Sequence, residues 1–193
     1  MFHLLAGLGN PGTQYTLTRH NAGFMVIDAI LDKFHFPNFK KKNNALISIG
    51  NIESYRVILV KPWTFMNNSG VPIMNIVSLY KIPLDNMIVF HDEVEIDFCT
   101  IRVKKSGGNA GHNGLKSIDN FLGKDYWRVR FGIGHPRNKM DLSDYVLSHF
   151  HNLNAVNNTI SSIVEHITLL LEKNHTTFTD KVRNTLKYED IPD

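Results

Sequence analysis

Apolar runs alternate with amphipathic stretches through most of the chain. Residues 2–8 form a continuous apolar run that stops at the turn-forming sequence GNPG, which predicts a buried first strand. Apolar residues spaced for one helical face then extend from about residue 21 to residue 34. Two β-rich runs at 45–52 and 56–62 are separated by a short polar turn and predict a hairpin. The sheet is therefore expected to be mixed.

The rest of the chain continues this alternation of strands and helices. The pattern predicts a helix at about 67–80, strands near 86–91, 100–105 and 128–134, a short helix that follows a glycine-rich loop and ends at 122, and helices at 155–172 and 177–187. No internal repeat or low-complexity linker interrupts the series. We therefore expect residues 1–193 to form a single α/β domain, with a twisted mixed β-sheet flanked by helices on both faces and a helical C-terminal portion.

Length and composition agree with one domain. The 193 residues, 42% of them hydrophobic, suffice for one well-buried core but are few for two full domains. The single cysteine, Cys99, cannot form an internal disulfide, and the sequence opens on the first predicted strand with neither a cleavable signal nor a long apolar span. We expect a cytoplasmic protein that does not enter a membrane.

Charge is distributed unevenly along the chain. The formal net charge is only +3, yet residues 101–140 hold nine lysines and arginines against two acids, a local net charge of +7 that leaves −4 for the remainder. Such a segment is typical of a surface that meets a polyanion such as nucleic acid. It is also typical of a basic face that is simply solvated.

Five polar residues follow the ends of apolar runs: Asn10, His20, Asn67, Asp92 and Asn113. In an α/β fold such positions can converge on one crevice. A histidine paired with an aspartate can act as a general base on water, and asparagine amides can hold a carbonyl without adding charge, so the set suggests acyl hydrolysis. Taken singly, each residue also has a structural interpretation. His20 fits a cap or a surface residue, Asp92 a cap, a turn or a metal ligand, Asn67 a helix cap, and Asn113 a left-handed turn.

Two cofactor signals are present, and both are weak. The sequence GLGNPG at residues 7–12 matches the dinucleotide-binding pattern G-x-G-x-x-G, but eight further residues precede the predicted helix, and the acids at the right distance, Asp28 and Asp32, lie inside it. The sequence HDE at 91–93 has no companion ligands at helical spacing, and neither HExxH nor a cysteine pair occurs. We expect no cofactor and no metal.

Five separated segments resemble the bacterial-type peptidyl-tRNA hydrolases and occur in the same order. They are LGNPGTQYTLTRHNAGF, KPWTFMNNSG, HDE, the GG..GHNGLKSI loop and RVRFGIGHP, within about residues 3–150. The resemblance implies an enzyme that hydrolyses the ester between a peptide and the 3′-terminal ribose of tRNA, and so recycles peptidyl-tRNA released from ribosomes. It implies peptidyl-tRNA, met at its acceptor end, as the partner of a monomer with no obligate protein partner.

The resemblance also implies roles for individual residues. His20 matches the family's catalytic base and Asp92 its orienting partner, in agreement with the chemistry of a histidine held by a carboxylate. Asn10, Asn67 and Asn113 match asparagines that position the substrate.

Further matches extend the expected site on both sides. Met66 and Tyr15 match positions at the edge of the substrate site, and Lys104 and Arg130 match positions that bind tRNA phosphates. Three basic neighbours would add to the field around these phosphates: Lys105, Arg128 and Arg137.

The chain departs from the family pattern at two places. Asn109 and Ala110 stand in the glycine-rich loop where relatives often carry His and Gly, and the segment after Asp92 lacks the proline-containing continuation common in the family. Because alanine adopts a positive φ less readily than glycine, the first departure bears on the mobility of the loop.

Two other functions remain open from the sequence. One is an RNA-binding module that has kept the fold without hydrolysis, although phosphate binding alone would not need His20, Asp92 and the three asparagines. The other is a nucleotide-dependent oxidoreductase built on the GLGNPG loop.

Overall fold

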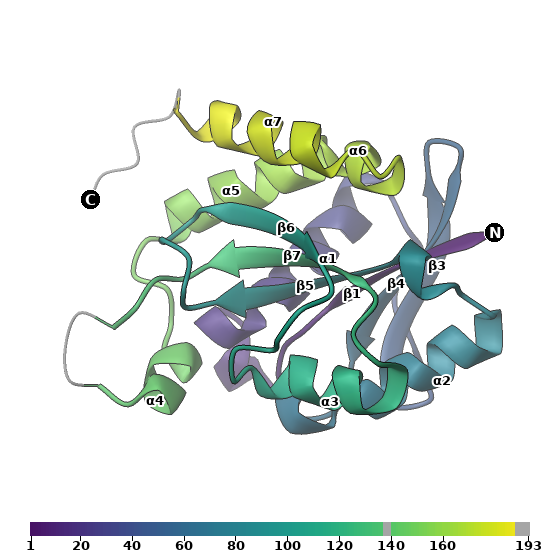
Figure 1. Cartoon of the computed structure of the whole chain (residues 1–193), viewed down its shortest axis with the longest axis horizontal. Helices are drawn as coiled ribbons and strands as arrows, with labels where there is room; N and C mark the ends of the chain where they lie inside the picture. Colours follow the sequence, from purple (N-terminus) through teal and green to yellow (C-terminus); the bar gives the residue numbers. More distant parts are fainter. Residues whose placement is uncertain (137–139, 188–193) are drawn as a thin grey trace.

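One mixed β-sheet forms the centre of the molecule, and helices cover both of its faces (Figure 1). The computed structural model describes residues 1–136 and 140–187, and within them the sheet has seven strands in the order β2-β3-β4-β1-β5-β7-β6. The strands are β1 (Phe2–Gly7), β2 (Lys40–Lys42), β3 (Ala45–Ile52), β4 (Tyr55–Pro62), β5 (Met87–Glu93), β6 (Ile101–Lys105) and β7 (Trp127–Gly132). The four central strands β4, β1, β5 and β7 are parallel, whereas β3 and β6 run antiparallel to their neighbours.

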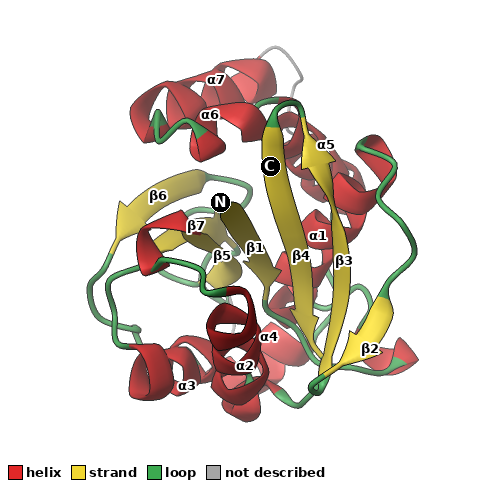
Figure 2. Ribbon diagram, turned by 90° about the vertical axis from the view of Figure 1, so that its right-hand side faces the viewer, coloured by secondary structure: helices red, strands yellow, loops and turns green. Residues whose placement is uncertain are grey.

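The helices form two layers, one on each face of the sheet (Figure 2). One layer contains α1, α5, α6 and α7, and the other contains α2 and α3. Their bounds are α1 (Ala22–Lys33), α2 (Gly70–Tyr80), α3 (Asn113–Leu122), α4 (Leu142–Leu147), α5 (Leu153–Glu165), α6 (Ile167–Leu171) and α7 (His175–Lys187). The short helix α4 stands apart from both layers, beyond the arrowheads of β5 and β7 (Figure 1). No helix among the described residues is long and apolar enough to cross a membrane.

Strands β1 and β4 are mainly apolar because both of their faces are buried. On β4, Val57 and Leu59 pack in the core beneath α1 and α5, while Ile58 and Val60 pack in the core beneath α2 and α3. Successive side chains of a strand point to opposite faces, so a strand covered on both sides reads as a continuous apolar run rather than an alternating one. The predicted mixed sheet with helices on both faces is confirmed.

Two elements differ from the sequence-based expectation. The helix expected at 155–172 is two helices, because His166 leaves helical geometry (φ −104°, ψ 12°) and turns the chain between α5 and α6. Strand β2 carries three exposed lysines, so no apolar pattern marks it. Lysines are common on edge strands, where they oppose pairing with other chains.

The backbones of β1, β5 and α1 approach one another very closely. A Cβ atom on Gly23 of α1 would lie 2.3 Å from the carbonyl oxygen of Phe90, and one on Gly7 would lie 2.2 Å from the carbonyl oxygen of Gly23. The amide of Leu8 donates to the carbonyl of Phe90 at 3.0 Å across the same crossing. This contact brings His20, just before α1, to the ends of β1 and β5. Two 3-10 turns separate the GLGNPG loop from α1, so the dinucleotide-binding geometry is absent there.

The close approach of α1 to β1 and β5 predicts how one methyl group added at Gly23 changes the stability of the protein. Gly23→Ala should lower the free energy of unfolding by at least about 3 kcal/mol, because the added Cβ would meet backbone atoms that cannot rotate away. Helix propensity alone predicts the opposite sign, a gain of up to about 1 kcal/mol. Urea unfolding measures the difference. Gly108→Ala is the control, since nothing lies within 4 Å of its added Cβ; equal stability of the two variants would contradict the prediction.

Candidate active site

Polar residues from distant parts of the chain meet at the carboxyl ends of the parallel strands. Asn10 follows β1, Met66 follows β4, and Asp92 lies near the end of β5. His20 lies in the 3-10 turn Arg19–Asn21 that leads into α1. Because all three strands point to the same edge of the sheet, their ends form the kind of crevice in which α/β proteins bind ligands.

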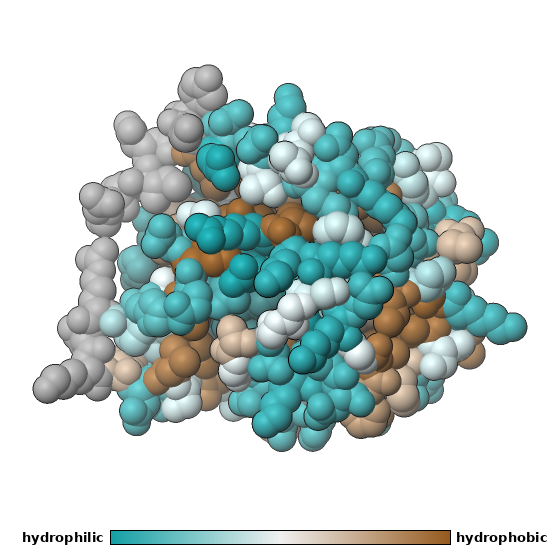
Figure 3. Space-filling view, viewed as in Figure 1, coloured by the Kyte–Doolittle hydropathy of each residue, from teal (hydrophilic) through white to brown (hydrophobic). Residues whose placement is uncertain are grey.

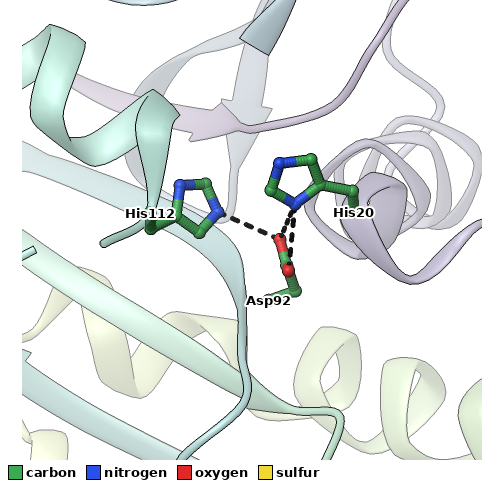
Figure 4. A group of neighbouring side chains, drawn as sticks. All are labelled: His20, Asp92 and His112. Atoms are coloured by element: carbon green, nitrogen blue, oxygen red, sulfur yellow. Dashed lines mark hydrogen bonds and ion pairs between the residues drawn. The ribbon is translucent and has the colours of Figure 1, made fainter. Parts of the chain in front are cut away.

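The centre of this crevice is a buried histidine–aspartate pair (Figure 4). The Nδ1 atom of His20 lies 2.9 Å from Oδ1 and 3.0 Å from Oδ2 of Asp92. The carboxylate can only accept, so Nδ1 of His20 carries the proton and Nε2 is the nitrogen left with a lone pair. The predicted proximity of His20 and Asp92 is confirmed by these distances.

A second imidazole, which the sequence-based reasoning did not identify, binds the same carboxylate. His112 places Nε2 at 3.0 Å from Oδ1 of Asp92, and its ring lies beside that of His20, with the ring centres 4.8 Å apart (Figure 4). Its other nitrogen, Nδ1, accepts hydrogen bonds from the amides of Gly114 (3.1 Å) and Leu115 (3.4 Å) and so caps α3. Because Nδ1 accepts, Nε2 must carry the proton and donate to Asp92. The capping residue of this helix is therefore a histidine, which single-residue cap preferences do not favour.

The protonation states follow from this arrangement. Burial favours a neutral carboxyl, but the hydrogen bonds and charges of His20 and His112 outweigh it and hold the pKa of Asp92 far below its usual range. Burial alone would lower the pKa of His20, but the charge of Asp92 and the hydrogen bond to it raise that pKa above its ordinary value. Burial lowers the pKa of His91 to about 3. The neutral His91 points Nδ1 at the carbonyl oxygen of Asp92, 2.7 Å away.

Asn10 is held in one orientation by two neighbours. The backbone N–H of Asn10 donates to Oδ1 of Asn21 at 2.8 Å, and Nδ2 of Asn21 donates to the backbone carbonyl of Asn10 at 3.0 Å. The side-chain oxygen of Asn10 accepts from the amide of Met66 at 2.8 Å. Asn10 therefore keeps its side-chain NH₂ group as a donor. Asn21 is a second residue that the sequence-based reasoning missed. Its role, which is to hold Asn10 in place, is evident only from the two hydrogen bonds between them.

Met66 links the asparagines on separate segments. It is buried, and its sulfur would lie 2.5 Å from a Cβ atom on Gly114, so a larger residue there would displace the Met66 side chain. Asn67 is exposed beside Met66, and Asn113 is exposed as the first residue of α3. Asn113 has no positive φ, so the left-handed turn interpretation is wrong.

The outer residues of the predicted site lie in different surroundings. Asn113 lines a cavity of about 180 Å³ together with Asp92 and His112. Tyr15 is half-buried in the 3-10 turn Thr13–Tyr15, and among the described contacts neither it nor Asn67 hydrogen-bonds to the His20–Asp92 pair.

The two predicted phosphate-binding residues share one face of the sheet edge. Lys104 on β6 pairs with Arg128 on β7, two residues from Arg130, so the three side chains point to the same side. Lys104 is exposed, whereas Arg130 donates to Glu93 at 3.1 Å. Arg128 is buried and paired with Asp119 at 3.0 Å. The expectation that Arg128 adds to an exposed basic field is therefore wrong.

The remaining basic neighbours contribute less than expected. Lys105 points to the other face and lies 2.9 Å from Asp85 and 3.4 Å from Asp125. Arg137 lies outside the described residues. An exposed cation that was not singled out, Arg102, pairs with Arg130 across the two strands and shares the face of Lys104.

Known proteins are similar to this chain over nearly its whole length. The sequence model of a family described as peptidyl-tRNA hydrolase matches residues 4–189. A peptidyl-tRNA hydrolase of Ehrlichia chaffeensis is 76% identical over 196 residues, which cover 100% of this chain and 99% of that protein. The chain belongs to the peptidyl-tRNA hydrolase family. A second relative, the peptidyl-tRNA hydrolase of Wolbachia pipientis, is 49% identical over 176 residues, 91% of this chain and 97% of that protein.

Solved structures of the peptidyl-tRNA hydrolase family have the same fold. The crystal structure of peptidyl-tRNA hydrolase from Acinetobacter baumannii superposes with a TM-score of 0.87 at 33% identity and covers 94% of both chains. The family resemblance and the α/β fold inferred from the sequence are confirmed.

The departure from the family pattern in the glycine-rich loop has a local structural consequence. Ala110 has a φ of +47°, a conformation that an alanine adopts only at a cost. The side chain of Asn109 accepts from the amide of Gly111 at 3.2 Å and closes a tight turn around Ala110. Asn109 therefore stabilises the turn in which Ala110 is strained.

The cluster at the centre of the site does not suit a metal ion. His20, Asp92 and His112 bring three donor atoms within 4.8 Å of one another. A metal-bound imidazole normally donates a hydrogen bond from its other ring nitrogen. In His112 that nitrogen accepts two backbone hydrogen bonds, so the proton is on Nε2, where a metal would need a lone pair. The two imidazoles donate hydrogen bonds to the carboxylate of Asp92, and the three side chains are not arranged as ligands of a metal ion.

Isotope-edited NMR of the histidine rings tests these assignments. At mildly alkaline pH we expect His20 as the Nδ1–H tautomer and His112 as the Nε2–H tautomer, because each ring donates to Asp92 through that nitrogen. The exposed His149 is the reference, since its ring makes no hydrogen bond to the described residues. A proton on Nδ1 of His112 would contradict both the helix cap and the argument against a metal.

Proposed function

We propose that this chain hydrolyses the ester between the peptide and the 3′-terminal ribose of peptidyl-tRNA, with His20 as the general base. The observation that carries the proposal is the buried carboxylate of Asp92, held by hydrogen bonds to His20 and His112. It supports a base with one fixed tautomer and a raised pKa. The name of the relatives, peptidyl-tRNA hydrolase, supports the choice of substrate.

The first step of the proposed reaction is attack by water. Nε2 of His20 takes a proton from the water as its oxygen bonds to the ester carbonyl carbon, which gives a tetrahedral oxyanion and an imidazolium. Asp92 stabilises the imidazolium through the Nδ1–H bond without taking the proton. The C–O bond to the ribose then breaks, and His20 returns its proton to the departing ribose hydroxyl. The products are a free peptide carboxyl group and an intact tRNA.

The asparagines supply donors without charge in this proposal. Asn10 offers its side-chain NH₂ group, because Met66 occupies the side-chain oxygen. Asn113 borders the cavity next to Asp92, and Asn67 lies exposed beside Met66. Met66 and Tyr15 form the outer limits of the same substrate site. A neutral donor aimed at a developing oxyanion is typically worth a hundredfold or more in rate.

The tRNA is proposed to lie over the edge of the sheet that carries Lys104 and Arg130. The surface around β6 and α3 is hydrophilic over most of this face (Figure 3). Arg130 already donates to Glu93, so a phosphate would share its guanidinium with that carboxylate. Contacts of this kind give affinity without reading sequence, as suits an enzyme for many tRNAs. We propose that the chain acts as a monomer in the cytoplasm, without a cofactor.

The second candidate, an RNA-binding module without hydrolysis, leaves the centre of the site unexplained. A carboxylate buried between two imidazoles is costly to desolvate and contributes nothing to phosphate binding. Lys104 and Arg130 alone would serve such a module.

His20→Ala tests the base directly. We expect release of peptide from peptidyl-tRNA to fall by at least about a thousandfold, because no other described group is positioned to take the proton from water. Turnover with an N-blocked aminoacyl-tRNA measures this, and circular dichroism verifies that the variant is folded. His149→Ala is the matched control because its side chain is exposed. Turnover retained by His20→Ala would reject His20 as the base.

Asp92→Asn tests the pairing through the pH profile. Asp92 raises the pKa of His20, so its replacement should lower that pKa and move the acid-side limb of kcat/KM to lower pH. The plateau should also fall by about 10² to 10⁴-fold, because an amide stabilises the imidazolium poorly and can favour the wrong tautomer. A pH–rate series on both proteins gives the result. An unchanged acid limb would show that Asp92 does not act on the base.

A further inference from the structure

Arg19, the residue before His20, is a buried cation with neutral partners. It is 7% exposed, and its guanidinium donates to main-chain carbonyls and a hydroxyl rather than to a carboxylate in the described contacts. Burying a cation is costly unless its donors are well satisfied. An apolar residue would fill the space without this cost, so the guanidinium must be fixing a particular arrangement of the chain around it.

The arrangement it fixes is the segment that follows α4. Nη1 of Arg19 lies 2.6 Å from the carbonyl oxygen of His149, and 2.6 Å and 3.2 Å from the hydroxyl and carbonyl oxygens of Ser148, so its two hydrogens are shared among three acceptors. Nη2 lies 3.4 Å from Nδ1 of His151, and Nε has no hydrogen-bond partner among the described residues. The guanidinium carbon lies 4.3 Å from the ring centre of Tyr145 and 5.7 Å from that of Phe150. A lysine could donate to the same carbonyls but has no flat face to lie on these rings.

Main-chain hydrogen bonds run beside these contacts and join the same two segments. The amide of Arg19 donates to the carbonyl of Ser148 at 3.1 Å, and the amide of Phe150 donates to the carbonyl of Leu17 at 3.2 Å. Residues 148–150 are therefore attached to the segment, residues 17–19, that leads directly into His20. A shift of this segment would move it relative to the catalytic base.

Helix α4 itself depends on this attachment. None of its residues is buried, and Leu142 and Leu147 expose 48% and 41% of their surface. It is joined to the body by Tyr145 and Val146, which pack against the core, and Tyr145 also lies on Arg19 and donates its hydroxyl hydrogen to the carbonyl of Ile133 at 2.6 Å. A helix with so little buried surface has little packing energy of its own, so its position depends on these few contacts.

Helix α4 forms one wall of the cavity beside the site. Leu142, Ser143 and Val146 face the same space of about 180 Å³ as Asp92 and Asn113. One side of that space is largely apolar and the other is polar. It suits a group that presents a polar ester or amide to Asn113 and an apolar side chain to α4.

We propose that Arg19 is a positioning residue that holds α4 at a fixed distance from the His20–Asp92 pair and so sets the width of the aminoacyl side of the substrate cavity. The proposal rests on the proposed hydrolase function for its kinetic consequences only. Since Arg19 acts on the cavity wall and not on the proton transfer, its loss should weaken substrate binding more than it slows the chemical step.

The test compares Arg19→Met and Arg19→Lys with the wild-type protein on an N-blocked aminoacyl-tRNA that has an apolar side chain. We expect Arg19→Met to raise KM about tenfold while kcat changes less than about threefold. The KM of Arg19→Lys should lie between those of the wild-type protein and Arg19→Met, because an ammonium group can still reach one of the two carbonyls. Arg183→Gln on α7 is the control, since that exposed arginine pairs with Asp180 and with no other acid among the residues that the structure describes. A fall in kcat at unchanged KM, or no change in either, would overturn the proposal.

Amide hydrogen exchange gives a second result that needs no activity. In Arg19→Met we expect faster exchange at residues 145–150 and unchanged exchange in β5, which has no contact with the guanidinium. Ser148→Ala, which removes the 2.6 Å acceptor, should have a smaller effect of the same kind, and the double variant should change exchange by less than the sum of the two single variants. Unchanged exchange at 145–150 would overturn the proposal even if the protein proves not to hydrolyse peptidyl-tRNA. Failure of the wild-type protein to turn over substrate would instead reject the proposed function.

Discussion

The buried charge of Asp92 is the constraint on which the rest of the site depends. A carboxylate with 3% exposure is stable only where donors replace its lost water, and here two imidazoles supply them. His20 comes from the turn before α1, and His112 comes from the start of α3. One charge therefore ties together three segments from distant parts of the chain and fixes the tautomer of both rings. The same contact raises the pKa of His20, so geometry and basicity have a single origin.

This arrangement is possible only because the backbones cross so closely. Gly7 and Gly23 let α1 begin directly against the ends of β1 and β5, where any side chain would meet main-chain atoms. Gly114 leaves room for the side chain of Met66 at the start of α3. The glycines that look like part of a nucleotide-binding pattern are therefore explained in part by packing. They bring helices close enough for short side chains to reach one carboxylate.

The sequence predicts most of the strands and helices because burial on both faces of the sheet leaves long apolar runs, as on β1 and β4. The family resemblance also predicts that His20 and Asp92 meet. Neither the apolar pattern nor that resemblance assigns a part to His112 or Asn21, whose roles show only in hydrogen bonds of the folded chain, to Asp92 and to Asn10. The sequence also does not show that Arg128 forms an internal ion pair, because Asp119 of α3 comes to face Arg128 of β7 only in the folded protein. Local pattern determines which elements form, whereas the choice of partner requires the tertiary structure.

Cations surround the site, yet none of those described contacts the pair directly. Arg19 directs its donors to carbonyls, Arg128 pairs with Asp119, and Arg130 pairs with Glu93. A free cation beside His20 would lower the basicity that Asp92 confers, and it would attract tRNA phosphates to the place where the ester must lie. In the proposed reaction, Lys104 on the edge strand would instead hold the polyanion away from the reacting carbonyl. With neutral amides as the proposed donors to that carbonyl, the phosphates would be attracted to the edge of the sheet while the base keeps its pKa.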